Sequence, residues 1–97
     1  ARAVIGLGLV AAQGVSSVVQ GVGYRFFAVK KAREYNMFGY VRNLPDGNVE
    51  IVAEGEKGLI LDFIEELRIG PVSATVTAVD VEWVDRPREY EDFEIQD

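Results

Sequence analysis

An arginine ends a short glycine-spaced segment near the start of the chain. The segment consists of Gln20, Gly21, Val22, Gly23, Tyr24 and Arg25. Glycine has no Cβ atom to hold an anion away from the backbone, so consecutive N–H groups can converge on one. If a helix begins within the segment, its unpaired first N–H groups and the positive end of its dipole add to the same site. The planar guanidinium of Arg25 can bind two phosphate oxygens at once. These residue types outline a phosphate cradle.

The glycine spacing could also indicate a tight turn or a nucleotide-binding motif. Taken alone, two glycines one residue apart are more typical of a tight turn than of a ligand site. A P-loop needs Gly-Lys-Ser/Thr, which is missing, and a dinucleotide fingerprint needs a third glycine where Phe26 stands. The evidence for a nucleotide site is therefore weak.

Asn43 is the second side chain that could do chemistry, because it ends a predicted strand just before a turn. Its amide can accept a hydrogen bond from a water and donate one to a phosphoryl oxygen at the same time. The simpler structural alternative is a cap on the hairpin turn, which propensity alone favours. Its neighbour Arg42 is expected on the opposite face, because side chains alternate along a strand.

The composition limits the possible chemistry. The 97 residues include no Cys and no His, which excludes a thiol nucleophile, a His general base, a Ser-His-Asp triad and every ordinary zinc site. The absence of Cys fits a reducing compartment, and we expect a cytoplasmic protein without metal or other cofactor. The net charge is −6, from 16 acidic and 10 basic residues, so a broad nucleic-acid surface is not expected. Any phosphate site must be local.

The positive charges lie closest together at and just beyond the glycine segment. This cluster consists of Arg25, Lys30, Lys31 and Arg33. For the last three residues, a solvated helix face is the simpler interpretation.

Hydrophobic periodicity and turn residues predict the elements that must position these side chains. They are a strand within residues 3–19, a helix over 24–35, strands over 37–43 and 49–54, a helix over 56–69, a strand over 75–84, and a short edge strand at Phe93 and Ile95. The second helix is the clearest, since Ile60, Phe63, Ile64 and Leu67 form one apolar stripe.

The element order β-α-β-β-α-β with a short closing strand is the pattern of a ferredoxin-like α/β sandwich. We expect an antiparallel sheet of four main strands, with two helices on one face, in a single domain over residues 1–97. The split βαβ unit places its flanking strands side by side, so Asn43 need not be far from the glycine segment. The small apolar run at residues 3–12 is too short to cross a membrane and is interpreted as part of a buried strand.

The two segments that carry the candidate residues resemble the two signature motifs of the acylphosphatase family. Residues 19–25 and 39–50 occur in the same order and at the same separation as in that family. Further similarities are Glu54-Gly55, Gly70-Pro71 with Ala74 and Val76, and residues 92–95. The resemblance covers about residues 18–96 and also implies the ferredoxin-like fold.

The resemblance implies hydrolysis of the carboxyl-phosphate bond of small-molecule acyl phosphates to a carboxylate and inorganic phosphate. The resemblance also implies that no metal or covalent intermediate takes part. Residues 20–25 correspond to the phosphate-binding loop, Arg25 to the arginine that binds the phosphate, and Asn43 to the asparagine that orients the attacking water. A carboxylate leaves without a general acid, because its conjugate acid has a pKa near ~4. A monomer without nucleic-acid or membrane partners is expected.

The sequence departs from the family before the glycine segment, where Ser17 replaces a usual glycine and residues 1–17 lack regular alternation. The register of the first strand therefore does not follow from the resemblance. One alternative function is a non-catalytic phosphate- or acyl-phosphate-binding module of the same fold. The lack of a Cys-rich zinc segment or a further domain argues against that module. Another is an RNA-binding domain, which shares this fold but is disfavoured by the charge of −6.

Overall fold

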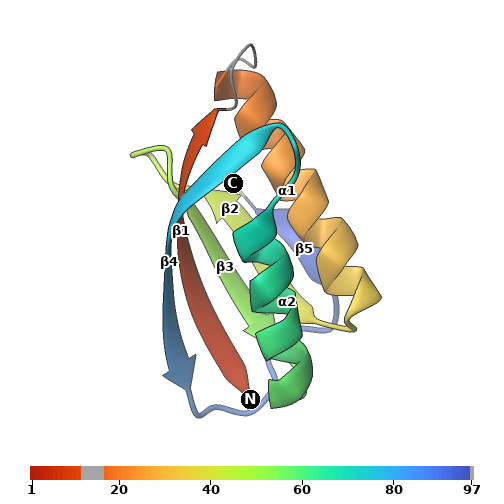
Figure 1. Ribbon diagram of the computed structural model, residues 1–97. Coiled ribbons are helices and arrows are strands. Elements are labelled where there is room, and N and C mark those ends of the chain that lie inside the picture. Colours follow the sequence, from red (N-terminus) through yellow and green to blue (C-terminus); the bar gives the residue numbers. More distant parts are fainter. Residues whose placement is uncertain (12–16, 97) are drawn as a thin grey trace.

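A computed structural model describes residues 1–11 and 17–96 of the chain, with only the backbone course for residues 11 and 17–22 (Figure 1). The elements are β1 (Arg2–Ala11), α1 (Ser17–Glu34), β2 (Phe38–Asn43), β3 (Val49–Glu54), α2 (Lys57–Ile69), β4 (Ala74–Val84) and β5 (Phe93–Gln96). Among the described residues, no helix is both long and apolar enough to cross a membrane.

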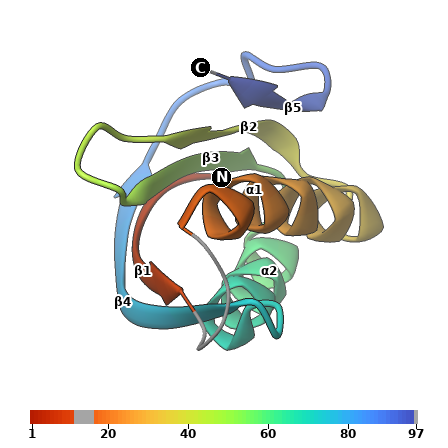
Figure 2. The same ribbon diagram turned by 90° about the horizontal axis from the view of Figure 1, so that it is seen from above.

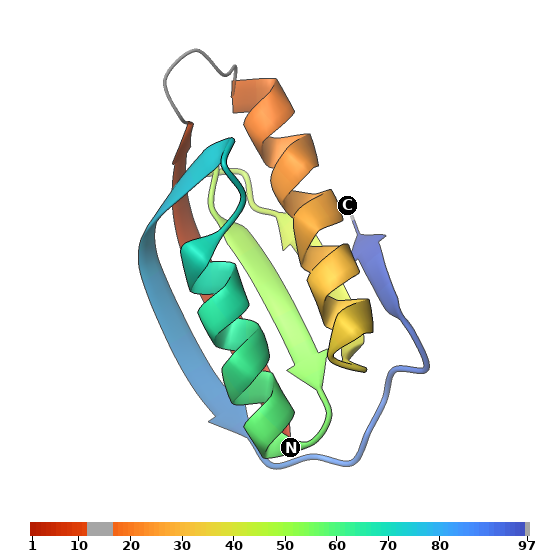
Figure 3. The same ribbon diagram turned by 45° about the vertical axis from the view of Figure 1, so that its right-hand side comes forward.

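The five strands form one sheet in the order β4-β1-β3-β2-β5. The four main strands pair antiparallel, and the short β5 lies parallel to β2 at the edge. Both helices cover the same face of the sheet, as Figures 1 and 3 show from two directions. This arrangement confirms the predicted ferredoxin-like sandwich, including the edge position of the closing strand.

The core lies between that face of the sheet and the two helices. Ile5 of β1 pairs with Ile51 of β3, and both side chains are fully buried. The apolar stripe predicted for α2 is also buried, from Ile60 to Leu67. Burying each such side chain contributes about 1.5–3 kcal/mol relative to leaving it in water. The alternation of the strands and the helical stripe therefore hold the layers together.

Helix α1 begins earlier than predicted. The glycine segment was expected to be a loop, with the helix starting at Tyr24, but the backbone is helical from Ser17. Sequence reasoning weighted the two glycines as loop formers, whereas a helix interior accepts each at a cost of about 1 kcal/mol. Gly23 also lies against the α2–β4 connection, where an added Cβ would lie 3.6 Å from Ser73 Oγ. The first strand is shorter than the range allowed for it and ends at Ala11.

The other end of α1 agrees with the sequence. The helix was predicted to end near Asn36, and its last residue is Glu34. Asn36 adopts a φ of +56°, the left-handed conformation in which asparagine is common at a helix end. The chain then turns directly into β2, which delivers Asn43 to the far end of its strand.

Candidate functional site

The strand register places Asn43 at one end of the sheet, on the face covered by the helices. Asn43 pairs with Val49 of β3, and Val49 pairs in turn with Leu7 of β1. Val49 and Leu7 are buried in the core, so the Asn43 side chain points to the same side while remaining exposed. Arg42 points to the opposite face, where its Nε donates to Glu50 at 2.8 Å. The predicted direction of Arg42 is therefore confirmed.

The chain returns to this end of the sheet along α1. Strand β1 continues from Leu7 to Ala11, a rise of ~13 Å at 3.3 Å per residue. Helix α1 then descends from Ser17, and Arg25 comes after ~12 Å at 1.5 Å per residue. The tip of β1 and the start of α1 lie at the same end of the molecule in Figure 1. Arg25 and Asn43 are thus brought to roughly the same level, one on the helix and one on the strand.

Arg25 lies on the flank of α1 that faces β2 and β5. Tyr24 and Ala28 point into the core, and Lys31 marks the flank toward α2 because its ammonium contacts Glu66 at 3.0 Å. On a helix with 100° between successive residues, Arg25 falls on the side away from Lys31. Arg25 therefore lies on the flank nearer to β2, the strand that ends at Asn43.

The half-buried Arg25 has one side-chain donor that is unsatisfied among the described residues. Its Nε is inaccessible to solvent and has no hydrogen-bond partner among the described residues. A buried donor without an acceptor costs about 1–3 kcal/mol, more when the group is charged. An anion bound at this position would remove that cost. This is the most direct sign in the structure of a site for a phosphate group.

Tyr24 anchors the segment that carries Arg25. Its ring is fully buried, and its hydroxyl donates to the backbone carbonyl of Leu67 in α2 at 2.7 Å. Burial raises the pKa of Tyr24, so the hydroxyl stays protonated and remains a donor. The Tyr24 side chain is thus engaged with α2 and is not available to a ligand.

The α2–β4 connection packs behind this anchor, a contact that sequence reasoning missed. Gly70 has a φ of +69°, and an added Cβ would lie 3.7 Å from the Tyr24 ring. The sequence signal for it is the Gly70-Pro71 pair, which by its residue types indicates only the end of a helix. The pair also lets the chain pass close to the Tyr24 ring, next to the residue that carries the candidate site.

The remaining predicted residues, Gln20, Gly21 and Val22, lie in the first turns of α1 together with Gly23. In an α-helix each N–H bonds to the carbonyl four residues earlier, so the N–H groups of residues 21–23 bond to the carbonyls of residues 17–19. The structure therefore places the backbone donors of residues 21–23 inside the helical ladder. The assignment of the segment to phosphate binding stays a prediction.

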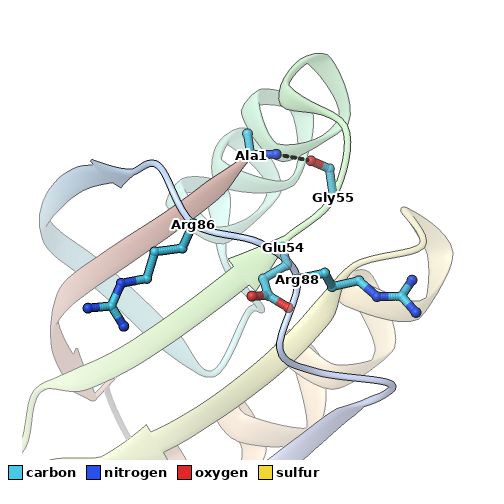
Figure 4. A pocket seen from close by; sticks show the side chains of 5 residues that line it. All are labelled: Ala1, Glu54, Gly55, Arg86 and Arg88. Carbon is cyan, nitrogen blue, oxygen red and sulfur yellow. Dashed lines mark hydrogen bonds between the residues drawn. The ribbon is translucent and has the colours of Figure 1, made fainter.

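A second hollow with arginines lies at the opposite end of the sheet but does not form an anion site. Figure 4 shows the pocket, of about 230 Å³, with Glu54 at its centre. Arg86 and Arg88 point away from Glu54 and from each other. The pocket therefore presents a carboxylate and diverging cations, and Arg25 remains the better candidate. The residues that the structure describes contain no group of three or more acidic, His or Cys side chains suited to a metal.

Comparison with known proteins gives a consistent result. The model of the acylphosphatase family matches residues 12–95. The acylphosphatase of Thermus thermophilus is 55% identical over 69 residues, covering 71% of this chain and 78% of that protein. The crystal structure of acylphosphatase from Bacillus subtilis superposes with a TM-score of 0.82 at 29% identity, covering 98% of this chain and 97% of that one. HypF from T. kodakarensis matches all of this chain with a TM-score of 0.74 at 31% identity, over 12% of its own length.

Proposed function

Since this chain belongs to the acylphosphatase family, we propose that it hydrolyses the carboxyl-phosphate bond of acyl phosphates to a carboxylate and inorganic phosphate. The observation that best supports a phosphate site is the Nε of Arg25, buried without a partner among the described residues. The site lies at the end of the sheet where β2 delivers Asn43.

The proposed roles follow from what the reaction needs. Arg25 binds the phosphoryl oxygens and stabilises the charge that they carry in the transition state. Asn43 holds the attacking water in line by accepting its hydrogen bond. The water oxygen attacks phosphorus, the bond from phosphorus to the carboxyl oxygen breaks, and its electron pair leaves on the carboxylate. The phosphate itself takes the proton of the water, so the chain needs no His or Cys.

The start of α1 supplies the rest of the proposed phosphate site. We assign the segment of residues 20–25 to it on its match to the family's phosphate-binding motif, although the helical ladder of α1 engages the N–H groups of residues 21–24. Because the leaving carboxylate is a weak base, the reaction needs no metal or other cofactor.

We further propose that residues 1–17 are an atypical beginning of one domain over residues 1–97, and that the protein acts as a cytoplasmic monomer on small molecules.

The test separates the two side chains. In benzoyl phosphate hydrolysis with EDTA present, Asn43→Ala lowers kcat on the order of 10²-fold or more but leaves competitive inhibition by inorganic phosphate intact. Arg25→Ala lowers turnover and also weakens phosphate inhibition. Two exposed residues provide matched controls: Asn48→Ala in the β2–β3 turn and Arg68→Ala on α2 keep wild-type activity. Equal and small effects of the Asn43 and Arg25 changes would refute the roles.

A non-catalytic phosphate-binding module is the second candidate. It is favoured by the match to HypF, in which a segment of this fold makes up 12% of a longer chain. In that case phosphate raises the Tm of the protein, since a ligand that binds only the folded state stabilises it. No acyl phosphate is turned over, and Arg25→Ala abolishes the phosphate-dependent shift in Tm.

A further inference from the structure

An open groove of about 280 Å³ runs between α1 and the edge strand β5. Figures 2 and 3 show the helix and the edge strand that border it. The groove is lined by Phe26, Val29, Arg33, Phe93, Glu94 and Ile95. The Phe26 ring is 61% exposed, although an aromatic side chain of this size is normally kept from water.

The helix side of the groove is continuous with the candidate site. Arg25, Val29 and Arg33 are spaced four residues apart, so they lie one below another on the same flank of α1. The groove therefore begins one helical turn, ~5 Å, beyond the residue proposed to bind the phosphate.

The strand side of the groove also lies next to the candidate site. Ile95 pairs with Val41 of β2, and Asn43 comes two residues later on the same face, ~7 Å along the strand. An acyl phosphate with its phosphate at Arg25 has the α1 wall of the groove directly beside it, and its acyl group lies on the side of phosphorus away from the water at Asn43.

The chemistry of the walls selects the kind of group that fits. Phe26, Val29 and Ile95 provide apolar surface nearest the site. Arg33 lies farther along, and its Nη2 is already directed at the Phe93 carbonyl at 3.5 Å, while the Glu94 side chain alternates to the other face of the sheet. The surface nearest the site is therefore apolar and suits a neutral apolar group.

We infer that this groove binds the acyl group of the substrate and gives the enzyme a preference for acyl phosphates with an aromatic or branched apolar group. The inference rests on the proposed function. A methyl group leaves the groove empty, whereas a phenyl group covers Phe26 and Val29 and displaces water from them. Apolar contacts of this kind discriminate by one to two orders of magnitude at most.

The experiment compares kcat/KM for benzoyl phosphate and acetyl phosphate in the wild type and in Phe26→Ser, Val29→Ser and Leu61→Ser. Leu61 is the matched control, since it is a half-exposed apolar residue on the other helix. The wild type prefers benzoyl phosphate about tenfold or more. Phe26→Ser and Val29→Ser reduce that ratio severalfold, and Leu61→Ser keeps it.

The possible failures are distinguishable. In one outcome the wild type hydrolyses both substrates, while its ratio of kcat/KM for benzoyl phosphate to acetyl phosphate is unchanged in Phe26→Ser, Val29→Ser and Leu61→Ser. That result contradicts acyl-group binding in the groove and leaves the proposed function unaffected. A wild type that hydrolyses neither substrate overturns both. Circular dichroism confirms folding of each variant, and exposed Phe26 gives the decisive variant because its side chain is not needed in the core.

Discussion

Glu54 is the most constrained charged residue of the described chain. Its carboxylate is 2% exposed and accepts hydrogen bonds from the guanidinium of Arg2 and from the backbone N–H groups of Glu89 and Tyr90. Burial by itself raises the pKa of Glu54, but the donors from Tyr90, Arg2 and Glu89 outweigh it, so the pKa lies below its ordinary value. This carboxylate fastens the β4–β5 connection to the end of the sheet.

The lowered pKa makes stability depend on pH in a definite direction. A carboxyl group with a depressed folded-state pKa stabilises the protein above its unfolded pKa, near ~4.3, and loses that contribution as pH falls through the folded value. We expect Glu54→Gln to lower the free energy of unfolding at pH 7 by about 1–3 kcal/mol, because the buried Arg2 then keeps only the half-exposed carboxylate of Glu89 as its counter-charge. In this variant the free energy of unfolding also changes less with pH in the acid range than it does in the wild type.

Urea unfolding at pH 7, 5 and 3 measures this effect. Glu65→Gln is the control, since Glu65 forms an exposed pair with Arg68 and its loss costs little. An acid profile of Glu54→Gln with the same slope as the wild type would show that Glu54 is not the group responsible.

Single residues also show what the sequence alone could identify. The types of Arg25 and Asn43 and their place in two motifs were enough to select both, and the alternation of β2 correctly separated Asn43 from Arg42. That the Nε of Arg25 is buried with no partner among the residues that the structure describes could not be predicted, because it depends on how α1 packs against the sheet and not on neighbours in sequence. The same holds for Glu54, which had been noted only as part of a Glu-Gly pair.

At the scale of elements, Gly39 controls how closely β2 and β3 approach. Its φ is +143°, and an added Cβ would lie 1.9 Å from the backbone oxygen of Val52. Its N–H also donates to the carbonyl of Asp92 at 2.8 Å, which starts the pairing with β5. Any larger residue at this position therefore pushes β2 away from its neighbours.

We expect Gly39→Ala to lower the free energy of unfolding by about 2 kcal/mol or more, through both the clash and the unfavourable φ. Gly58→Ala in the first turn of α2 is the matched change. There the added Cβ would meet only a Glu56 carboxylate oxygen, at 3.0 Å, and that flexible side chain can move. Alanine raises stability by about 0.5–1 kcal/mol at a helical position. Thermal unfolding of the two variants should shift in opposite directions, and equal shifts would contradict the argument.

The elements differed in how well they could be predicted. Helix α2 and the β2–β3 hairpin were predicted closely, because an apolar stripe and a Pro-Asp-Gly turn are local signals. The β1–α1 junction was not, because the apolar residues before it show no alternation. Gly6 and Gly8 lie on the outer face of β1, where polar side chains would normally produce the alternation of apolar and polar residues that indicates a strand. Burial of Tyr24 against α2 stabilises the first turns of α1, a tertiary effect that outweighs the two glycines.

At the scale of the whole molecule, the candidate site and the Arg2–Glu54 pair lie at opposite ends of one sheet. Trp83 lies near the second end, where it pairs with Ala3 and where the Lys57 ammonium lies 5.0 Å from the ring centre. It is the sole tryptophan of the chain, so its fluorescence reports on that end. The helices, in contrast, dominate the far-ultraviolet circular dichroism.

We expect these two signals to give the same midpoint in urea, since one core connects both ends and small domains unfold as a unit. Two separate midpoints would show that the ends of the sheet unfold independently. The slope should be about 1 kcal/mol per M urea for a domain of this size. The measurement also tests whether residues 1–97 form a single domain.

The position of β1 between β4 and β3 has a consequence for the order of events as the chain is made. The strand emerges from the ribosome before either neighbour exists, since β3 begins at Val49 and β4 at Ala74. At about 5–20 residues per second, the most apolar strand of the sheet waits on the order of seconds with both hydrogen-bonding edges open. The nascent chain is therefore most vulnerable to aggregation at β1, until β4 is synthesised and completes the pairing of that strand.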